Sequence, residues 1–128
     1  VLPLLRWSLL DLVLACLDGR VAEVDPAFGP GFAVDVVLAS GGYPGSYRTG
    51  LPIGGLDSPD EDALVFHAGT RRQPDGTVVT AGGRVLNVVG RGETLDEAIG
   101  RAYQRAAGIS FDGMFYRSDI GRRPWQPG

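Results

Sequence analysis

The 128-residue sequence has the length of a single domain, and its hydrophobic and charged fractions of 44% and 21% are ordinary for a globular protein. The net charge of −3 argues against a basic nucleic-acid-binding surface, so we expect no nucleic-acid partner. A single cysteine and a single histidine exclude a disulfide framework and a zinc site built from these residues. All twelve basic residues are arginine, which excludes a Schiff-base lysine and the phosphate-binding lysine of a P-loop.

An apolar stretch opens the chain and predicts a helix over residues 4–18, with leucines on every side of it. Such a helix is typically buried on most sides. We expect it to end at Asp18, with Gly19 as its C-terminal cap. Arg6 and Asp11 interrupt the stretch too closely for a membrane span or a secretion signal, so we expect a cytoplasmic protein with no membrane partner. Because a short chain offers little protein to cover this helix, we expect it to be part of something larger.

Several β-branched, apolar stretches predict strands, at residues 32–39, 64–70 and 84–90. The segment Gln73-Pro-Asp-Gly76 predicts a turn, because proline presets its backbone angle and glycine accepts a positive one. Residues 77–80 then form the return strand of a hairpin. A further short strand or hairpin arm is predicted within residues 109–116.

The strongest local signal is a capping box, in which Thr94 is the N-cap and Glu97 stands three residues further on. Apolar residues follow with the spacing of an amphipathic helix, and Gly108 ends it. The chain therefore predicts an α+β fold, with a small antiparallel sheet or partly open barrel, an N-terminal helix and one amphipathic helix.

Most candidates for chemistry have a plainer interpretation. Cys16 lies in an apolar helix, where a thiol is inert, and nothing places His67 beside it, so we expect no catalytic pair. The acidic residues between 57 and 62 lack the spacing of a calcium loop, so a solvated loop is favoured over a metal site. We predict no catalytic residue and no metal ligand in this chain. Arg122 and Arg123 form a basic pair suited to acidic groups of another domain.

The glycine-rich segment at residues 40–47 follows a predicted strand, where open N–H groups can bind an anion. A structural turn is the alternative, and the residues alone favour it. Arg71 and Arg84 flank the predicted hairpin and would lie near one rim. Two guanidinium groups with open glycine backbone between them suit a phosphate dianion. Solvated surface arginines are the alternative for this pair.

Seven motifs occur in one order between residues 38 and 123, within a stretch from about residue 1 to residue 124 that resembles a known family. They lie at residues 38–47, 65–70, 82–86, 92–95, 111–114, 116–117 and 119–123, and include LASGGYPGSY, VFHAGT, GGRVL and DIGRR. In these motifs the chain closely resembles the C-terminal domain of the phosphoribosylamine–glycine ligases, also called glycinamide ribonucleotide synthetases.

The resemblance implies part of an ATP-grasp ligase of de novo purine biosynthesis. Such an enzyme joins glycine to 5-phosphoribosylamine with ATP and forms glycinamide ribonucleotide, ADP and phosphate. It uses ATP with magnesium or manganese, whose ligands lie upstream of this region. Residues 1–19 then correspond to the last helix of the ATP-grasp core, and residues 20–128 to a barrel-like C-terminal domain of the rudiment single-hybrid type. Such a chain would be inactive alone and would contribute substrate binding and closure of the site.

The resemblance also implies roles for individual residues. Related ATP-grasp enzymes hold the 5′-phosphate of their substrate with basic residues of this domain, in a segment similar to residues 82–88 here, although Asn87 stands where glycine is usual. Arg71 and Arg84 are thereby implied as phosphate ligands. A possible substrate loop comprises Gly41, Gly42, Tyr43, Gly82 and Gly83.

A second interpretation remains open. The chain could be a stand-alone, non-catalytic domain whose apolar N-terminal helix docks on a partner chain, such as the rest of a split synthetase. If the isolated chain is monomeric and well folded, the helix is covered within the chain; if it oligomerises, the helix belongs to an interface.

Overall fold

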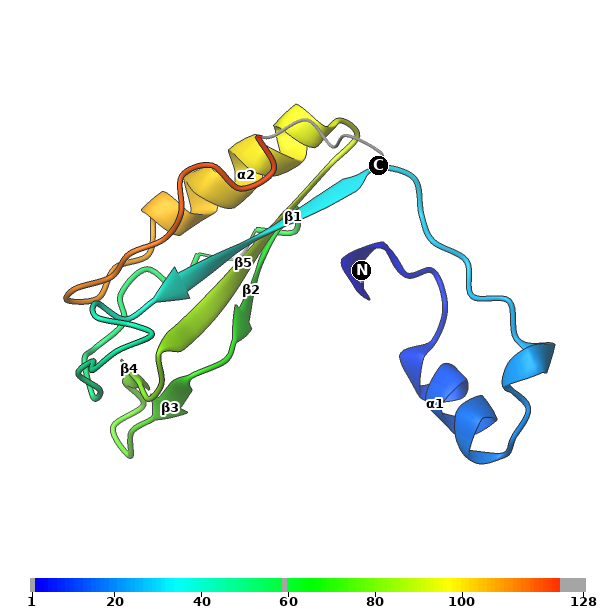
Figure 1. Ribbon diagram of the computed structural model, residues 1–128, viewed down its shortest axis with the longest axis horizontal. Helices are drawn as coiled ribbons and strands as arrows, with labels where there is room; N and C mark the ends of the chain where they lie inside the picture. The colour runs from blue at the N-terminus through cyan, green and yellow to red at the C-terminus, as the bar shows by residue number, and fades with distance from the viewer. Residues whose placement is uncertain (1, 59, 123–128) are drawn as a thin grey trace.

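The computed structural model describes residues 2–58 and 60–122, and most of them form one α+β body (Figure 1). Its three-stranded antiparallel sheet is covered on one face by the helix α2 (Leu95–Ala107). The strand order is β1-β5-β2, and the strands span Phe32–Ala39 (β1), Arg84–Gly92 (β5) and Ala63–His67 (β2). A separate two-stranded sheet pairs β3 (Thr70–Arg72) with β4 (Val78–Thr80). The α+β class with a small antiparallel sheet is thus confirmed.

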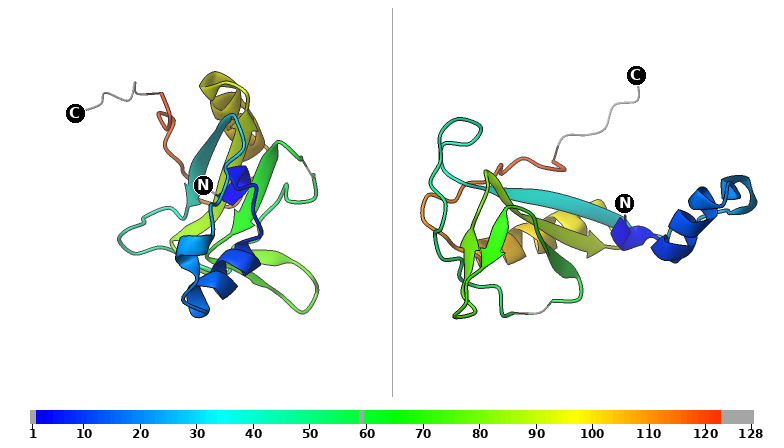
Figure 2. Two further views of the ribbon diagram at one scale, coloured as in Figure 1. Left: turned by 90° about the vertical axis from the view of Figure 1, so that its right-hand side faces the viewer. Right: turned by 90° about the horizontal axis from the view of Figure 1, so that it is seen from below.

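The segment before β1 extends away from this body (Figure 2). It contains α1 (Leu9–Leu17) between two short 3-10 helices, η1 (Leu2–Leu4) and η2 (Val21–Glu23). Its two ends run side by side, because the Arg6 N–H donates to the Ala27 carbonyl at 2.8 Å and the Gly29 N–H donates to the Leu4 carbonyl. The segment therefore folds back on itself around α1, and its helix η1 contacts the strand β1 of the body.

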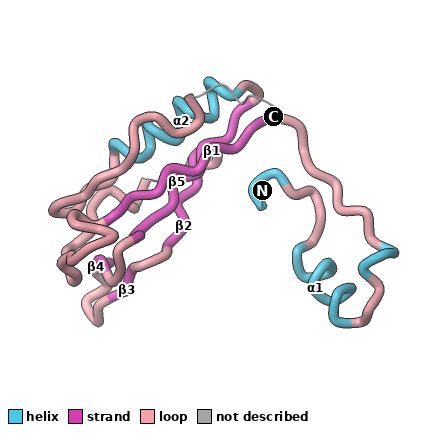
Figure 3. Tube along the Cα trace, in the orientation of Figure 1, coloured by secondary structure: helices cyan, strands magenta, loops and turns pink. Residues whose placement is uncertain are grey.

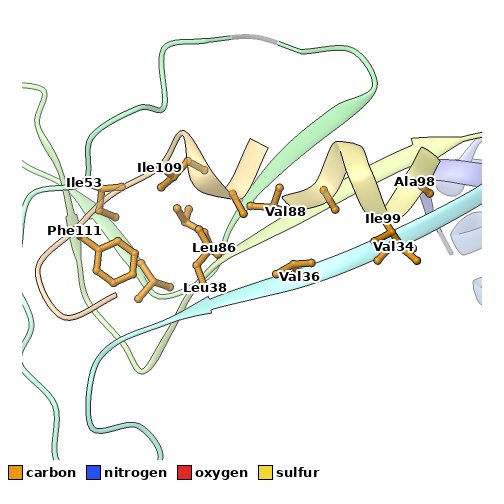
Figure 4. Close-up of a cluster of buried hydrophobic side chains, with 13 residues drawn as sticks. Val34, Val36, Leu38, Ile53, Leu86, Val88, Ala98, Ile99, Ile109 and Phe111 are labelled. Atoms are coloured by element: carbon orange, nitrogen blue, oxygen red, sulfur yellow. The ribbon is translucent and has the colours of Figure 1, made fainter. Parts of the chain in front are cut away.

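The core of the body lies between the sheet and α2 (Figure 4). Every second residue of β1 points into it, and the small residues of α2 allow the helix to approach the strands closely. The labelled core residues are Val34, Val36, Leu38, Ile53, Leu86, Val88, Ala98, Ile99, Ile109 and Phe111. Gly90 is needed for this approach, since a Cβ atom there would overlap the backbone of Ala98 and Ala102.

A β-bulge in β5 decides which of its side chains face the helix. Along β1, the pairing partner in β5 jumps from Leu86 to Arg84, which leaves Val85 as an extra residue. Val85 and Leu86 are both fully buried. The usual alternation therefore shifts at this point, and Arg84 and Asn87 fall on the open face of the sheet, away from α2.

Several sequence predictions are confirmed. The strand predicted at residues 32–39 is β1, and the turn at Gln73–Gly76 closes the β3–β4 hairpin, with the Gly76 N–H donating to the Gln73 carbonyl at 3.0 Å. The capping box at Thr94 is complete, since both of its reciprocal hydrogen bonds are present. The first helix ends as expected, with Asp18 as C-cap and Gly19 at a positive φ of 70°.

Other boundaries were wrong. The first helix starts at Leu9 with Ser8 as its N-cap, not near residue 4, and only Ala15 among its residues is buried. The strand predicted over residues 64–70 is divided into β2 and β3, because the chain changes sheet at Ala68 and Gly69. Residues 109–116 form no strand; they make single bridges from Ser110 to Gly54 and from Phe115 to Ala39 and otherwise run as loop (Figure 3).

Candidate anion-binding site

A hollow of about 520 Å³ opens where the glycine-rich loop meets the start of β5, and we call it the Arg84 pocket. Its floor consists of small residues and its polar groups come from three longer side chains. The lining residues are Tyr43, Ala68, Gly69, Gly83, Arg84 and Asn87. The pocket therefore brings together three of the seven residues that the sequence suggested as site residues.

The glycine-rich loop is held over the Gly82–Gly83 turn by two hydrogen bonds of Ser40. Its N–H donates to the Gly83 carbonyl at 2.8 Å, and its Oγ donates to the Gly82 carbonyl at 2.9 Å. The ring of Tyr43 then lies directly against Gly83, where a Cβ atom would overlap it. A residue larger than glycine at position 83 would displace this ring, so loop and turn form one wall.

Arg84 is the cation of this pocket. It is exposed, and it makes no hydrogen bond or ion pair with any residue that the structure describes. Several backbone N–H groups of the adjoining loop and turn also lack a partner, although Gly83 itself is buried. Over residues 2–58 and 60–122, no hydrogen bond is donated by the backbone N–H groups of Gly41, Gly42, Gly82 or Gly83. An unpartnered guanidinium on a loop and turn with unpaired N–H groups is an arrangement that suits an oxyanion.

Arg71 lies outside this lining. It stands on β3, is exposed, and has no partner among the described side chains. The backbones of the two regions are nonetheless adjacent, because the N–H of Gly69, two residues before Arg71, donates to the Arg84 carbonyl at 2.9 Å. The two arginines thus flank one strand junction, and their joint action on a phosphate stays a prediction.

A second hollow, of about 400 Å³, continues along the open face of the sheet. It shares Asn87 with the Arg84 pocket, and its other lining residues are Leu2, Pro3, Ala33, Asp35, Phe66 and Val89. Asp35 is exposed at its edge, yet partial burial of the carboxyl group raises its pKa above the ordinary value. Asp35 was not a site residue in the sequence prediction, because a lone acidic residue in a strand gives no signal.

The nominal nucleophile and base are kept apart. Cys16 lies on α1 and is exposed, so the burial expected for this apolar helix was wrong at Cys16. The His67 ring is engaged by a neighbour on its own chain segment, with Nδ1 3.0 Å from the Thr70 hydroxyl oxygen. Within the described ranges, neither residue is bonded to the other.

The acidic loop does not gather into a metal site. In the part of the chain that the structure describes, no group of three or more His, Cys, Asp or Glu side chains is placed to hold a metal ion. Asp62 instead contacts two arginines, at 3.8 Å from Arg91 and 3.3 Å from Arg101.

In the C-terminal pair, Arg122 lies 5.4 Å above the Tyr103 ring, and Arg123 is outside the described residues. Over the described ranges, no helix is long and apolar enough to cross a membrane.

Comparison with known proteins places this geometry in a family. Residues 33–123 match the family described as Phosphoribosylglycinamide synthetase, C domain. The chain is 46% identical over 125 residues to a phosphoribosylamine–glycine ligase of Nostoc sp. The match covers 96% of this chain and 29% of that protein. It is also 46% identical to a bifunctional purine biosynthetic protein of Dictyostelium discoideum, of which it spans 15%.

A solved structure agrees with this result. The crystal structure of phosphoribosylamine–glycine ligase from Thermotoga maritima has a TM-score of 0.68 and 43% identity to this chain; the match covers 84% of this chain and 27% of that one. The chain thus spans less than a third of the length of these relatives. From the extent of the family match and the identity to its members, the chain belongs to the phosphoribosylglycinamide synthetase C-domain family.

Proposed function

We propose that this chain serves as the C-terminal domain of a phosphoribosylamine–glycine ligase. Such an enzyme joins glycine to 5-phosphoribosylamine at the expense of ATP, in de novo purine biosynthesis. The observation that supports the proposal is the family match over residues 33–123, together with relatives of that name that are 46% identical over 96% of the chain.

The nucleotide and its metal belong elsewhere in this proposal. The carboxylates of the described residues do not fit a magnesium or manganese site, since they do not gather and Asp62 is engaged by two arginines. We therefore assign ATP and its metal ion to an ATP-grasp core, and derive no step through them here. What this domain contributes is substrate binding and a wall that excludes water from the reacting groups.

The phosphate of 5-phosphoribosylamine is the group that we assign to the Arg84 pocket. A phosphate dianion accepts charge-assisted hydrogen bonds from a guanidinium, and Arg84 lacks any competing partner among the described residues. The N–H groups of Gly82 and Gly83 donate no hydrogen bond within the described residues, and they would add uncharged donors from the adjoining turn. Arg71, Gly41 and Gly42 are proposed to complete the set from the adjoining strand and loop.

Substitution of Arg84 in the full-length ligase tests this role. If the phosphate is held equally in the ground and transition states, Arg84→Ala raises KM for 5-phosphoribosylamine by about ten- to a hundredfold, while kcat falls much less. Arg71→Ala acts in the same direction. Arg72 is a matched control, because it is the next residue of β3 and hydrogen-bonds the Gly76 carbonyl instead. Unchanged KM and kcat in Arg84→Ala would contradict the proposed phosphate site.

We further propose that the segment up to residue 19 packs on the ATP-grasp core, whose last helix it would supply, and that the C-terminal domain follows from residue 20. The exposed leucines of α1 support this, because a helix with so much bare apolar surface needs a cover. The alternative is a stand-alone domain that binds a partner chain through the same helix. Sedimentation of the isolated chain, alone and with a ligase core, distinguishes the cases. A chain whose helix is covered stays monomeric, whereas a chain with an exposed apolar helix oligomerises or binds the core.

A further inference from the structure

Asn87 occupies an unusual position. It lies in β5, the central strand of the three-stranded sheet, and its cross-strand neighbours are Val37 and Phe66. Asparagine is depleted in strands, and a polar side chain between apolar neighbours gains nothing from packing. The amide also makes no hydrogen bond to any residue in the described ranges. Sheet formation therefore does not account for an asparagine at this position.

The surroundings of Asn87 indicate a ligand. Asn87 and Arg84 line the same pocket, because the bulge at Val85 turns both onto the open face of the sheet. They are three residues apart on one strand, which corresponds to about 10 Å between their Cα atoms. None of the six lining residues carries a carboxylate. The pocket thus offers a cation at one end and a neutral amide further along, a pattern that fits an anion followed by hydroxyl groups.

We propose that Asn87 is a specificity-determining residue that hydrogen-bonds the vicinal hydroxyl groups of a pentose 5-phosphate whose phosphate is bound at Arg84. This inference rests on the phosphate site proposed above. An amide is well suited to a vicinal diol, because its carbonyl oxygen accepts a hydrogen bond from one hydroxyl and its NH₂ donates to the other. An apolar residue at this position would leave both hydroxyls unpaired on a dehydrated surface.

Tyr43 completes the arrangement as a wall. Its ring is held against Gly83 and lines the pocket together with Asn87, so a sugar bound there is enclosed on the side of the glycine-rich loop. The flat apolar face of a ring packs well against the C–H groups of a pentose. The site therefore distinguishes a pentose phosphate from inorganic phosphate by contact area, and ribose from deoxyribose by Asn87.

Calorimetric titration of the full-length ligase with three probes tests the proposal: inorganic phosphate, ribose 5-phosphate and 2-deoxyribose 5-phosphate. We expect the ribose compound to bind about three- to tenfold more tightly than the deoxyribose compound, the range of a neutral hydrogen bond. Asn87→Val should abolish this preference and leave the affinity for inorganic phosphate unchanged. Asn87→Ser, which keeps a donor and an acceptor, should retain part of the preference.

The outcomes separate the two proposals. Valine suits a central strand, so Asn87→Val is expected to fold, and circular dichroism verifies this. A preference for ribose that persists in Asn87→Val, or is absent from the unmodified chain, overturns the role of Asn87. In that case the phosphate site still stands if Arg84→Ala weakens all three probes. If no probe binds, or Arg84→Ala weakens none, the phosphate site is wrong and the role of Asn87 falls with it.

Discussion

The two helices of this chain have the same kind of beginning and different surroundings. Ser8 caps α1 and Thr94 caps α2, and in each case the hydroxyl oxygen accepts a hydrogen bond from the N–H three residues on. Five residues of α2 are buried against the sheet, whereas α1 buries Ala15 alone. α1 is the more apolar helix of the two and also the more exposed.

The contrast shows that local sequence signals specify where a helix begins but not whether it is buried. A capping residue and a helical sequence specify where a helix begins, but a helix of nine residues is marginal in water without packing. The amphipathic pattern of α2 matches the one sheet face available to it. Most of the leucines of α1 stay exposed among residues 2–58 and 60–122, so packing within these residues adds little to the stability of this helix.

The same substitution placed in each region tests this contrast with the largest expected effect. Leu38 is fully buried in β1, whereas the side chain of Leu17 on α1 is 78% exposed. We expect Leu38→Ala to lower the free energy of unfolding by about 2–5 kcal/mol, because it removes buried methyl groups and leaves a cavity. Leu17→Ala should change it by about 0.5 kcal/mol or less.

Chemical denaturation, followed by far-ultraviolet circular dichroism, measures the change in the free energy of unfolding for both variants. An equal loss of unfolding free energy in the two variants would mean that α1 is packed in solution as firmly as β1. The contrast between a packed core and an exposed N-terminal segment would then be wrong. A gain in stability for Leu17→Ala would sharpen the contrast, because it would show that the exposed leucine favours association over folding.

Substitution of the two N-caps gives a smaller and more local test. Thr94→Ala should cost about 1 kcal/mol of global stability, because it removes the hydroxyl oxygen that accepts a hydrogen bond from the Glu97 N–H, while the Glu97 carboxylate keeps its own bonds to backbone N–H groups. Ser8→Ala is the matched control. It should reduce the helicity of α1 and leave the main unfolding transition in place, since α1 contributes little to the core. Hydrogen exchange of the two helices, measured together, reports both effects.

Much of the body could be predicted because its signals are local. The capping box at Thr94, the alternation in β1 and the turn at Gln73–Gly76 each depend on a few neighbouring residues. The break between β2 and β3 could not be predicted in this way. It depends on the contact of Gly69 with Gly82 and the Arg84 carbonyl, which are distant in sequence.

The candidate site was predictable in part for the same reason. Glycine clusters, the arginines beside the predicted hairpin and the family resemblance suggested Gly83 and Arg84, and both line the pocket with Tyr43. The bulge at Val85 was not foreseeable from the spacing of apolar residues, because Val85, Leu86 and Val88 are all apolar and the sequence allows either register. Without knowledge of that bulge, the sequence does not show that Arg84 and Asn87 share a face of the sheet, and Asn87 is an unexplained polar residue in a strand.

Asp35 tests how the segment before β1 contacts the sheet, with the smallest expected effect. Leu2 and Pro3 of η1 line the hollow beside its carboxyl group, and partial burial raises the pKa of that group above its ordinary value of 3.8. The folded state then binds the proton more tightly than the unfolded state does. The cost of the charged carboxylate is absent below pH 3.8 and grows as the pH rises through the raised pKa.

Asp35→Asn should therefore raise Tm slightly at neutral pH and leave it unchanged well below pH 3.8, and titration of the Asp35 carboxyl by NMR should give a value above 3.8. Deletion of the segment up to residue 19 should change that value, because η1 would no longer exclude water from the hollow. If the titration is the same with and without the segment, η1 does not rest on the sheet in solution, and the desolvation of Asp35 comes from the residues of the sheet that line the hollow.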